Sequence, residues 1–228
     1  MAYQFDWSTI YRAWPYILEG LGVTGLLVLV GMTLGIALGT VLALMRLFGS
    51  RPVAMAAAVY VNVFRAIPLI LTIFWFFFLM PWVVRLVTGN PYAGIGPVYA
   101  AIAALVLAEA AYYCEILRAG IASVAKGQLN AAKAIGLTQA QALRYVVLPQ
   151  AFRNMTPALI NQTIALLKDT SLVYVISLND FLGAATKVAE RDGTVVEMYI
   201  FVAISYLFLC SLGVGLVKLI ERRHHIQK

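Results

Sequence analysis

Residues 24–46 read TGLLVLVGMTLGIALGTVLALMR, a run in which the closing Arg46 is the first charged side chain. A bilayer core about 30 Å thick is crossed by about 20 mostly apolar residues in a helix. Only helices and closed barrels satisfy every backbone hydrogen bond in lipid, and this uninterrupted run lacks the alternation of a barrel strand. Gly31, Gly35 and Gly39 recur every four residues within it, which predicts close packing against a neighbouring helix.

Similar apolar runs recur along the whole chain. It has 228 residues, of which 62% are apolar and 12% charged, with a mean hydropathy of +0.87. Soluble domains contain roughly 45–50% apolar residues, so this composition indicates an integral membrane protein. We predict an all-α, polytopic membrane protein with about five transmembrane helices in a single domain, residues 1–228. The expected spans are 21–45, 56–80, 99–121, 156–177 and 198–220, the second kinked or ended by Pro68 and Pro81.

Lysine and arginine are unevenly divided between the two sides that these spans define. With the C-terminus in the cytoplasm, the inner segments hold eleven of the seventeen basic residues and the outer segments hold four. By the positive-inside rule the N-terminus then lies outside and the C-terminus inside. The net charge of +7 thus reports orientation, and we expect membrane lipid but no nucleic acid as a partner.

The segment GQLNAAKAIGLTQAQALRYVVLP, residues 127–149, is too polar to cross a bilayer and lies inside by this orientation. Its alanine-rich first part favours a helix that ends at Gly136. Thr138 and Gln141 then have the spacing of a capping box for a second short helix, whose continuation Pro149 is expected to limit. The residues alone leave two interpretations open, an amphipathic loop at the membrane interface or a docking surface for another protein.

The spacing within this segment resembles the cytoplasmic coupling loop of type I ATP-binding-cassette (ABC) importer permeases. That family pattern is Glu-Ala-Ala, three residues, Gly, nine residues and then Ile-x-Leu-Pro, and this chain departs from it at Asn130 and Val146. The resemblance implies a helix-turn-helix coupling loop at about 126–149 that docks into the ATP-hydrolysing subunit. The docking residues that it implies are Asn130, Ala131, Ala132, Gly136, Leu148 and Pro149.

Further stretches are similar to the polar amino-acid group of these permeases, and most closely to permease subunits for glutamate and aspartate. They include YVNVFRAIPL, EAAYYCEILRAGI, DTSLVYVISLNDF and ERDGTVVEM. The resemblance implies a subunit of the bacterial inner membrane. Its implied partners are an ABC ATPase, a second permease subunit, similar or identical, and an external, periplasmic amino-acid-binding protein.

Other function classes lack their sequence patterns. The chain has no GxxxxGK[ST] phosphate loop, so we expect ATP and Mg²⁺ to be bound by the partner ATPase and no cofactor by this chain. A membrane enzyme would need a catalytic set such as HExxH, which is absent, and the two cysteines and two histidines are interpreted as packing or solvated residues, not metal ligands. An ion-driven secondary amino-acid transporter is the alternative, although no paired repeat is visible.

Polar side chains inside the expected spans are candidates for the translocation path, because an ionised group in lipid is costly. The candidates are Arg65, Glu109, Lys168, Asp169, Thr170 and Ser171. Arg65 and Lys168 would offset the charge of an acidic amino acid. The alternative for such charges is structural pairing, for which Glu115 and Arg118 have a suitable spacing on one helix.

Residues 179–197, NDFLGAATKVAERDGTVVE, form an expected outer loop with charges of both signs. A solvated loop explains these charges. The resemblance implies a second interpretation, contact with the external binding protein, for which Glu190, Arg191 and Asp192 are the candidates.

Overall fold

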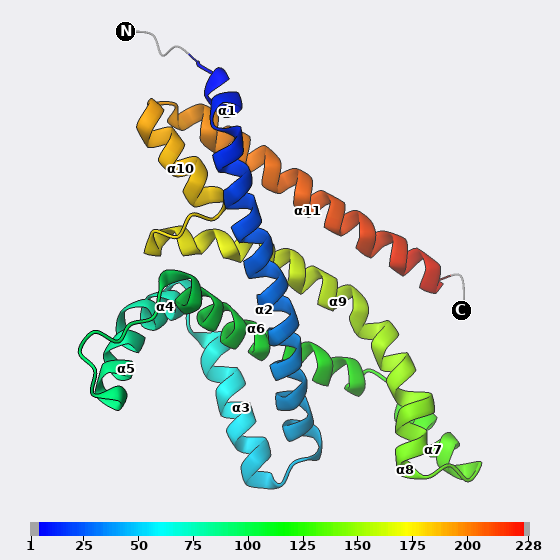
Figure 1. Ribbon diagram of the computed structural model, residues 1–228. Helices are drawn as coiled ribbons and strands as arrows, with labels where there is room; N and C mark the ends of the chain where they lie inside the picture. Colours follow the sequence, from blue (N-terminus) through cyan, green and yellow to red (C-terminus); the bar gives the residue numbers. More distant parts are fainter. Residues whose placement is uncertain (1–4, 226–228) are drawn as a thin grey trace.

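The computed structural model describes residues 5–225, which are mostly helical and contain no strand. The elements in chain order are α1 (Ser8–Arg12), α2 (Trp14–Phe48), α3 (Arg51–Ala66), α4 (Leu69–Phe74), the π-helix η1 (Trp75–Leu79), α5 (Met80–Thr88), α6 (Pro97–Ala122), α7 (Lys126–Ala134), α8 (Gln139–Ala142), the π-helix η2 (Leu143–Val147), α9 (Leu148–Asp169), the 3-10 helix η3 (Thr170–Ile176), α10 (Phe181–Asp192) and α11 (Val195–His225) (Figure 1).

The predicted all-α membrane fold is confirmed. Helices long and apolar enough to cross a membrane are Trp14–Phe48, Leu69–Thr88, Pro97–Ala122 and Val195–Leu219. A fifth span results if Gln139–Ile176 and Phe181–Asp192, which are bent by 48° at their break, count as one. The first, third and fifth expected spans lie within α2, α6 and α11.

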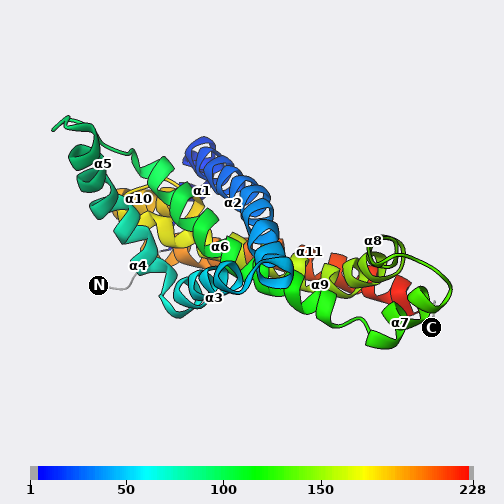
Figure 2. The same ribbon diagram turned by 90° about the horizontal axis from the view of Figure 1, so that it is seen from below.

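The long helices α2 and α6 cross at the centre of the molecule (Figures 1 and 2). A Cβ atom at Gly39 would stand 2.9 Å from a backbone carbonyl oxygen of α6, and one at Gly35 would stand 3.0 Å from the Cβ of Glu109. A Cβ at Gly31 would meet Leu166 of α9 at 3.3 Å. The predicted packing role of the three glycines is confirmed, since they let α2 lie directly on its neighbours.

The expected second span, 56–80, is wrong, because the chain leaves the helix in its middle. Ile67 and Pro68 have extended backbone, with ψ angles of 133° and 134°. Pro68 lacks the N–H that a continuing helix needs, and its ring disfavours helical backbone at the preceding residue. The candidate span is instead Leu69–Thr88. Pro81 does not end this span, because the π-helix η1 precedes the proline and α5 continues beyond it.

The expected outer loop, 179–197, is also wrong, because most of it is helix α10. The Asp180 carboxylate accepts hydrogen bonds from the backbone N–H groups of Leu182 and Gly183, at 3.2 and 2.9 Å, and so caps the helix start. Gly193, with φ of 69°, follows its last residue. The apolar face of α10 packs against α2 and α11, so these residues gain a core that a free loop would not have.

Opposite ends of the molecule carry different elements. α1, α10 and the start of α11 lie together at one end, whereas α7 and α8 form a corner far from them (Figure 1). Cys114 and Cys210 are free thiols in α6 and α11, and the described side chains, those of residues 5–215 and 217–219, contain no group of three able to hold a metal ion. Most candidate functional residues fall into three regions, namely the two ends and a cavity between them, and residues 168–171 lie between the cavity and α10.

Candidate functional site

A cavity of about 540 Å³ lies between α3, α6 and α9. Both α3 and α9 pack against α6, which connects the two sides of the cavity. Small-molecule sites commonly have volumes of about 300–1,000 Å³, so this cavity has room for a small polar ligand. The polar residues that line it are Arg65, Tyr112, Glu115, Ser123, Asn154 and Gln162.

Arg65, in the last turn of α3, is an exposed basic residue at this cavity. Its guanidinium carbon lies 5.7 Å from the centroid of the Tyr112 ring, a cation–π contact that holds the side chain against α6. Within the described part of the chain, Arg65 forms no ion pair with an acidic side chain. Its charge is therefore available to a ligand in the cavity.

Glu109 is only 2% exposed and lies behind the cavity wall, against α2. Both of its carboxylate oxygens accept hydrogen bonds from Nε2 of Gln162 on α9, at 3.1 Å each. The hydroxyls of Tyr113, one turn after Glu109 on α6, and Thr163, directly after Gln162 on α9, share a hydrogen bond of 3.2 Å. Glu109 is thus near the predicted path but reaches the cavity through Gln162. Sequence reasoning missed this residue of the expected span 156–177, because a single uncharged amide is a weaker signal than a charge or a run of polar residues.

Glu115 forms ion pairs with two arginines, in agreement with the structural pairing that the sequence offered as the alternative to a role in the path. Arg118 of the same helix donates to its Oε1, which confirms the expected pair. Arg46 at the end of α2 donates to its Oε2 at 2.5 Å, a partner that the sequence did not indicate because it is far along the chain. Two guanidinium groups on one carboxylate join α2 to α6 beside the cavity.

The four consecutive polar residues 168–171 lie further along α9 and η3 and do not line this cavity. Lys168 is exposed, Asp169 and Ser171 are half-buried, and Thr170 is buried and donates to the Leu167 carbonyl oxygen at 2.8 Å. Gln162 precedes Lys168 by six residues, which corresponds to roughly 9 Å along a helix. Arg65 and Lys168 are therefore not brought together at one place in the cavity.

The corner between α7 and α8 is a tight helix-turn-helix. Gly136 has φ of 89°, its N–H donates to the Lys133 carbonyl, and the Leu137 N–H donates to the Ala132 carbonyl. These two bonds satisfy carbonyl groups at the end of α7 in the Schellman arrangement. Thr138 and Gln141 form the predicted capping box at the start of α8. The turn is therefore fixed on both sides of Gly136.

Exposure separates the residues of this corner. Asn130, Ala131, Gly136 and Pro149 are exposed and Leu148 is half-buried, but Ala132 is only 4% exposed and packs inside the corner. Ile135, beside the glycine turn, is 80% exposed and was missed by sequence reasoning. The sequence pattern that could have identified Ile135 is a large apolar residue standing alone among small and polar residues.

Pro149 does not limit the second helix as expected. The π-helix η2 precedes it, and α9 begins at Leu148 and runs on through the proline. The wider turn accommodates a residue without an N–H, and Gln150 Nε2 donates to the Val146 carbonyl at 2.9 Å. The corner is consequently continuous with α9, which leads to the cavity.

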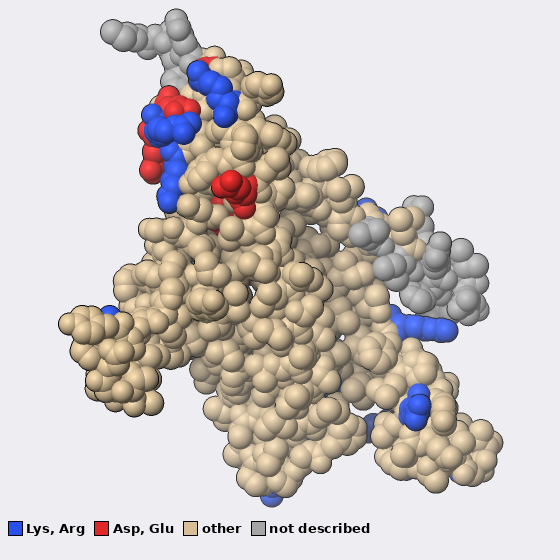
Figure 3. Space-filling view, in the orientation of Figure 1, with Lys and Arg blue, Asp and Glu red and all other residues tan. Residues whose placement is uncertain are grey.

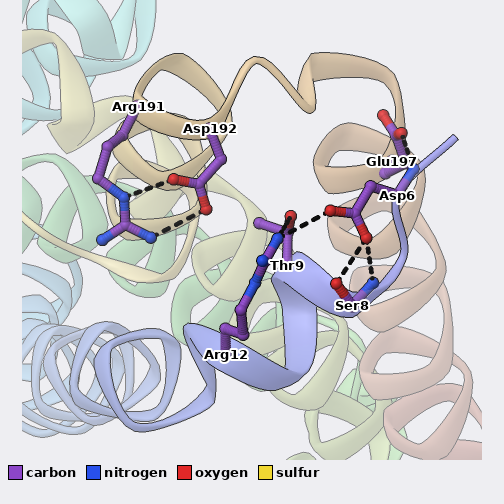
Figure 4. Close-up of polar contacts among 7 residues, drawn as sticks. All are labelled: Asp6, Ser8, Thr9, Arg12, Arg191, Asp192 and Glu197. Atoms are coloured by element: carbon purple, nitrogen blue, oxygen red, sulfur yellow. Dashed lines mark hydrogen bonds and ion pairs between the residues drawn. The ribbon is translucent and has the colours of Figure 1, made fainter. Parts of the chain in front are cut away.

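Charged side chains gather at the opposite end of the molecule, over α1 and α10 (Figure 3). Asp6 accepts hydrogen bonds from the Ser8 hydroxyl and backbone N–H, at 2.6 and 2.9 Å, and pairs with Arg12 at 2.8 Å (Figure 4). The Ser8 hydrogen bonds and the Arg12 charge lower the pKa of Asp6 below its usual value. The Asp6 backbone N–H donates to the Glu197 carboxylate at 2.8 Å, which ties α1 to the start of α11.

Arg191 and Asp192, two of the predicted outer contact residues, pair with each other beside Asp6 and Arg12 (Figure 4). Glu190, the third, is exposed near the end of α10 but is not part of this hydrogen-bonded group. Sequence reasoning missed Asp6 and Arg12, because their closeness to α10 arises only when α1 folds against it. The end of the molecule thus presents a surface of mixed charge.

Comparisons with known proteins agree with these features. The model of the family described as binding-protein-dependent transport system inner membrane component matches residues 31–225. The chain is 46% identical to the glutamate/aspartate import permease protein GltK of Escherichia coli O157:H7, covering 97% of this chain and 99% of that protein. It is 35% identical to the arginine transport system permease protein ArtQ of Bacillus subtilis, covering 96% of each.

A solved structure has a similar fold. The structure described as an amino acid ABC transporter with histidines superposes with a TM-score of 0.87 at 32% identity, and the match covers 97% of this chain and 100% of that one.

Proposed function

This chain belongs to the family of binding-protein-dependent transport system inner membrane components, and we propose that it imports the acidic amino acids glutamate and aspartate. It is a multi-pass permease of the inner membrane and part of an ABC importer, which implies an ATP-binding subunit and a substrate-binding protein as partners. The observation that carries the substrate proposal is the near full-length similarity to a glutamate/aspartate permease. Membership of this family gives no support to the ion-driven alternative.

The cavity between α3, α6 and α9 supports an acidic substrate. Arg65 offers a charged, planar group that suits a carboxylate, and it has no acidic partner among the side chains that the structure describes. In this proposal Glu109 acts from behind the wall through Gln162. Lys168, Asp169, Thr170 and Ser171 continue the path along α9 and η3 toward the outer end.

The corner formed by α7 and α8 supports docking of the ATPase. Its rigid turn exposes one large apolar side chain, Ile135, which a groove on another protein would bury. We assign Ala132 a supporting role inside the turn. The contact residues in this proposal are Asn130, Ala131, Gly136, Leu148 and Pro149. ATP and Mg²⁺ are bound by that partner, with no ATPase site or cofactor in this chain.

The orientation follows from the docking proposal and from the positive-inside rule. The corner faces the cytoplasm, together with the C-terminus, and the N-terminus lies outside. The mixed-charge surface then meets the external binding protein through Glu190, Arg191 and Asp192, joined by Asp6 and Arg12. A second permease subunit, similar or identical to this one, completes the pore.

Uptake into vesicles tests the substrate proposal. The vesicles carry this chain, its second permease subunit and the ATPase, with ATP inside and the binding protein outside, and receive labelled L-glutamate or L-arginine. We expect glutamate to be preferred and Arg65→Ala to slow its uptake about tenfold or more, because a charged hydrogen bond is lost. Arg65→Lys retains part of the rate, and Arg51→Ala on the same helix serves as the control.

Two results would contradict the proposal. A preference for arginine would show that the substrate is not acidic. Glutamate uptake at the wild-type rate by Arg65→Ala would remove Arg65 from the path.

A further inference from the structure

The amide of Gln162 is oriented by its partner. Glu109, when ionised, has only hydrogen-bond acceptors, so it must face the amide nitrogen of Gln162 and not the amide oxygen. Nε2 lies 3.1 Å from each carboxylate oxygen and therefore commits its donor capacity to Glu109. The amide group is planar, so its carbonyl oxygen points away from the carboxylate.

That carbonyl oxygen remains available in the cavity wall. Gln162 lines the cavity, and no donor from the described residues reaches its Oε1. The Gln162 oxygen has no hydrogen-bond partner among these residues, yet it is not one of the fully buried atoms without a partner. It is therefore accessible to a ligand in the cavity. A free carbonyl oxygen accepts hydrogen bonds, so the matching ligand group is a donor.

The charge behind Gln162 favours a cationic donor. Glu109 is 2% exposed and forms no ion pair with any Lys, Arg or His side chain that the structure describes, those of residues 5–215 and 217–219. When Glu109 is ionised, its Gln162 hydrogen bonds stabilise the charge and polarise the amide, which makes the Gln162 oxygen a stronger acceptor. Across α6, Arg65 presents the opposite charge to the same cavity.

We propose that the Gln162 carbonyl oxygen binds the ammonium group of an amino acid in this cavity, and that Glu109 is the positioning residue that holds the amide in this orientation. Arg65 takes a carboxylate of the same molecule. This assignment rests on the proposed transport of amino acids and adds to it how the permease distinguishes an amino acid from a plain dicarboxylate.

Three variants distinguish an effect of the orientation of the Gln162 amide from an effect of packing between α6 and α9. Glu109→Gln has almost the same shape, but two facing amides pair in either direction and the acceptor is no longer held toward the cavity. The double variant Glu109→Gln, Gln162→Glu reverses the pair, since the amide at position 109 then donates to a carboxylate at position 162 that still offers an acceptor. Tyr113→Phe removes a hydrogen bond between the same two helices away from the cavity lining, and is the matched control.

The assay is competition binding by the assembled importer in nanodiscs, without binding protein, between labelled L-glutamate and unlabelled L-glutamate or glutarate. Glutarate keeps both carboxylates and lacks the ammonium group. We expect the wild type and Tyr113→Phe to bind L-glutamate about tenfold or more tightly than glutarate, the scale of one charged hydrogen bond. Glu109→Gln reduces this ratio to about threefold or less, and the reversed pair restores it.

An unchanged ratio in Glu109→Gln would overturn the assignment, as would a wild type that binds the two ligands equally or binds no L-glutamate. The uptake assay on the same preparation separates this failure from failure of the proposed function. ATP-driven glutamate uptake with an unchanged binding ratio refutes only the ammonium site, whereas absence of that uptake refutes the transport proposal itself.

Discussion

Single glycines on α2 determine how closely the central helices approach each other. Gly39 lies where any side chain would stand 2.9 Å from backbone atoms of α6, which have no freedom to move aside. Gly25 is on the same helix, but a Cβ atom added there would have nothing within 4 Å. Alanine substitutions at Gly39 and Gly25 therefore separate the cost of crowding between the helices from the general preference of helices for alanine over glycine.

We expect Gly39→Ala to destabilise the detergent-solubilised protein by about 1–3 kcal/mol, the usual cost of overpacking. Gly25→Ala should leave the stability unchanged or raise it by up to about 1 kcal/mol. Thermal unfolding of the two variants beside the wild type measures the difference. Equal midpoints for Gly39→Ala and Gly25→Ala would show that α2 and α6 are not in close contact.

Glu115 is the residue that joins Arg46 of α2 to Arg118 of α6. The side chains are 19–35% exposed, so water weakens these pairs without removing their effect. Glu115→Gln should lower stability by about 1 kcal/mol, whereas Asp192→Asn, whose partner is the adjacent, 65% exposed Arg191, should give no measurable change. A thermal midpoint of Glu115→Gln identical to that of the wild type would refute the structural role of the pairs.

At the scale of elements, the corner of α7 and α8 joins a fixed turn to the start of α9. The Schellman bonds at Gly136 and the capping box of Thr138 and Gln141 hold the turn, and η2 continues into α9 without a break. Ile135 stands exposed on this rigid support. An apolar side chain held in this way loses little conformational freedom when a partner buries it.

Ile135→Asp should weaken co-purification of the ATPase about tenfold or more and reduce ATP-dependent uptake in proportion, because it places a charge in an apolar contact. Gln128→Asp introduces the same charge in the first turn of α7, where a negative group suits the helix dipole, and should behave like the wild type. Normal ATPase recovery with Ile135→Asp would remove this side chain from the interface.

Elements with strong local patterns were predictable from the sequence. The apolar runs predicted α2, α6 and α11, the glycine spacing predicted the packing of α2, and Thr138 with Gln141 predicted the start of α8. At Pro68 the sequence predicted either a kink or an end of the helix, because it does not show whether packing keeps a proline inside a continuing helix. Helix α10 was not predicted, because charges of both signs in residues 179–197 obscure its apolar face, although Asp180 and Gly193 are ordinary helix boundaries.

The cavity was less predictable than the helices. Arg65 was identified because a charge inside an apolar run is unusual. Its neighbours in the cavity wall come from α6 and α9, so the hydrogen bond of Glu109 with Gln162 depends on the distance and rotation between two helices. These quantities follow from tertiary packing, which no spacing along one segment reports.

For the whole molecule, α9 connects the three regions. It begins at the corner, passes the cavity at Gln162 and leads through η3 to α10 at the charged end. A movement of the corner would therefore reach the cavity wall through one helix. This arrangement suits a permease in which ATP hydrolysis by another subunit changes access to a substrate.

The most direct test of ATP-coupled import is uptake of labelled L-glutamate into vesicles with this chain, its second permease subunit, the ATPase and the binding protein. We predict that this uptake requires ATP. It should be lost in Gly136→Val, because φ of 89° is strained for any side chain. It should persist in Gly127→Val, where the backbone angle is not positive and the side chain meets open space. Glutamate uptake driven by an ion gradient without the ATPase would contradict the account.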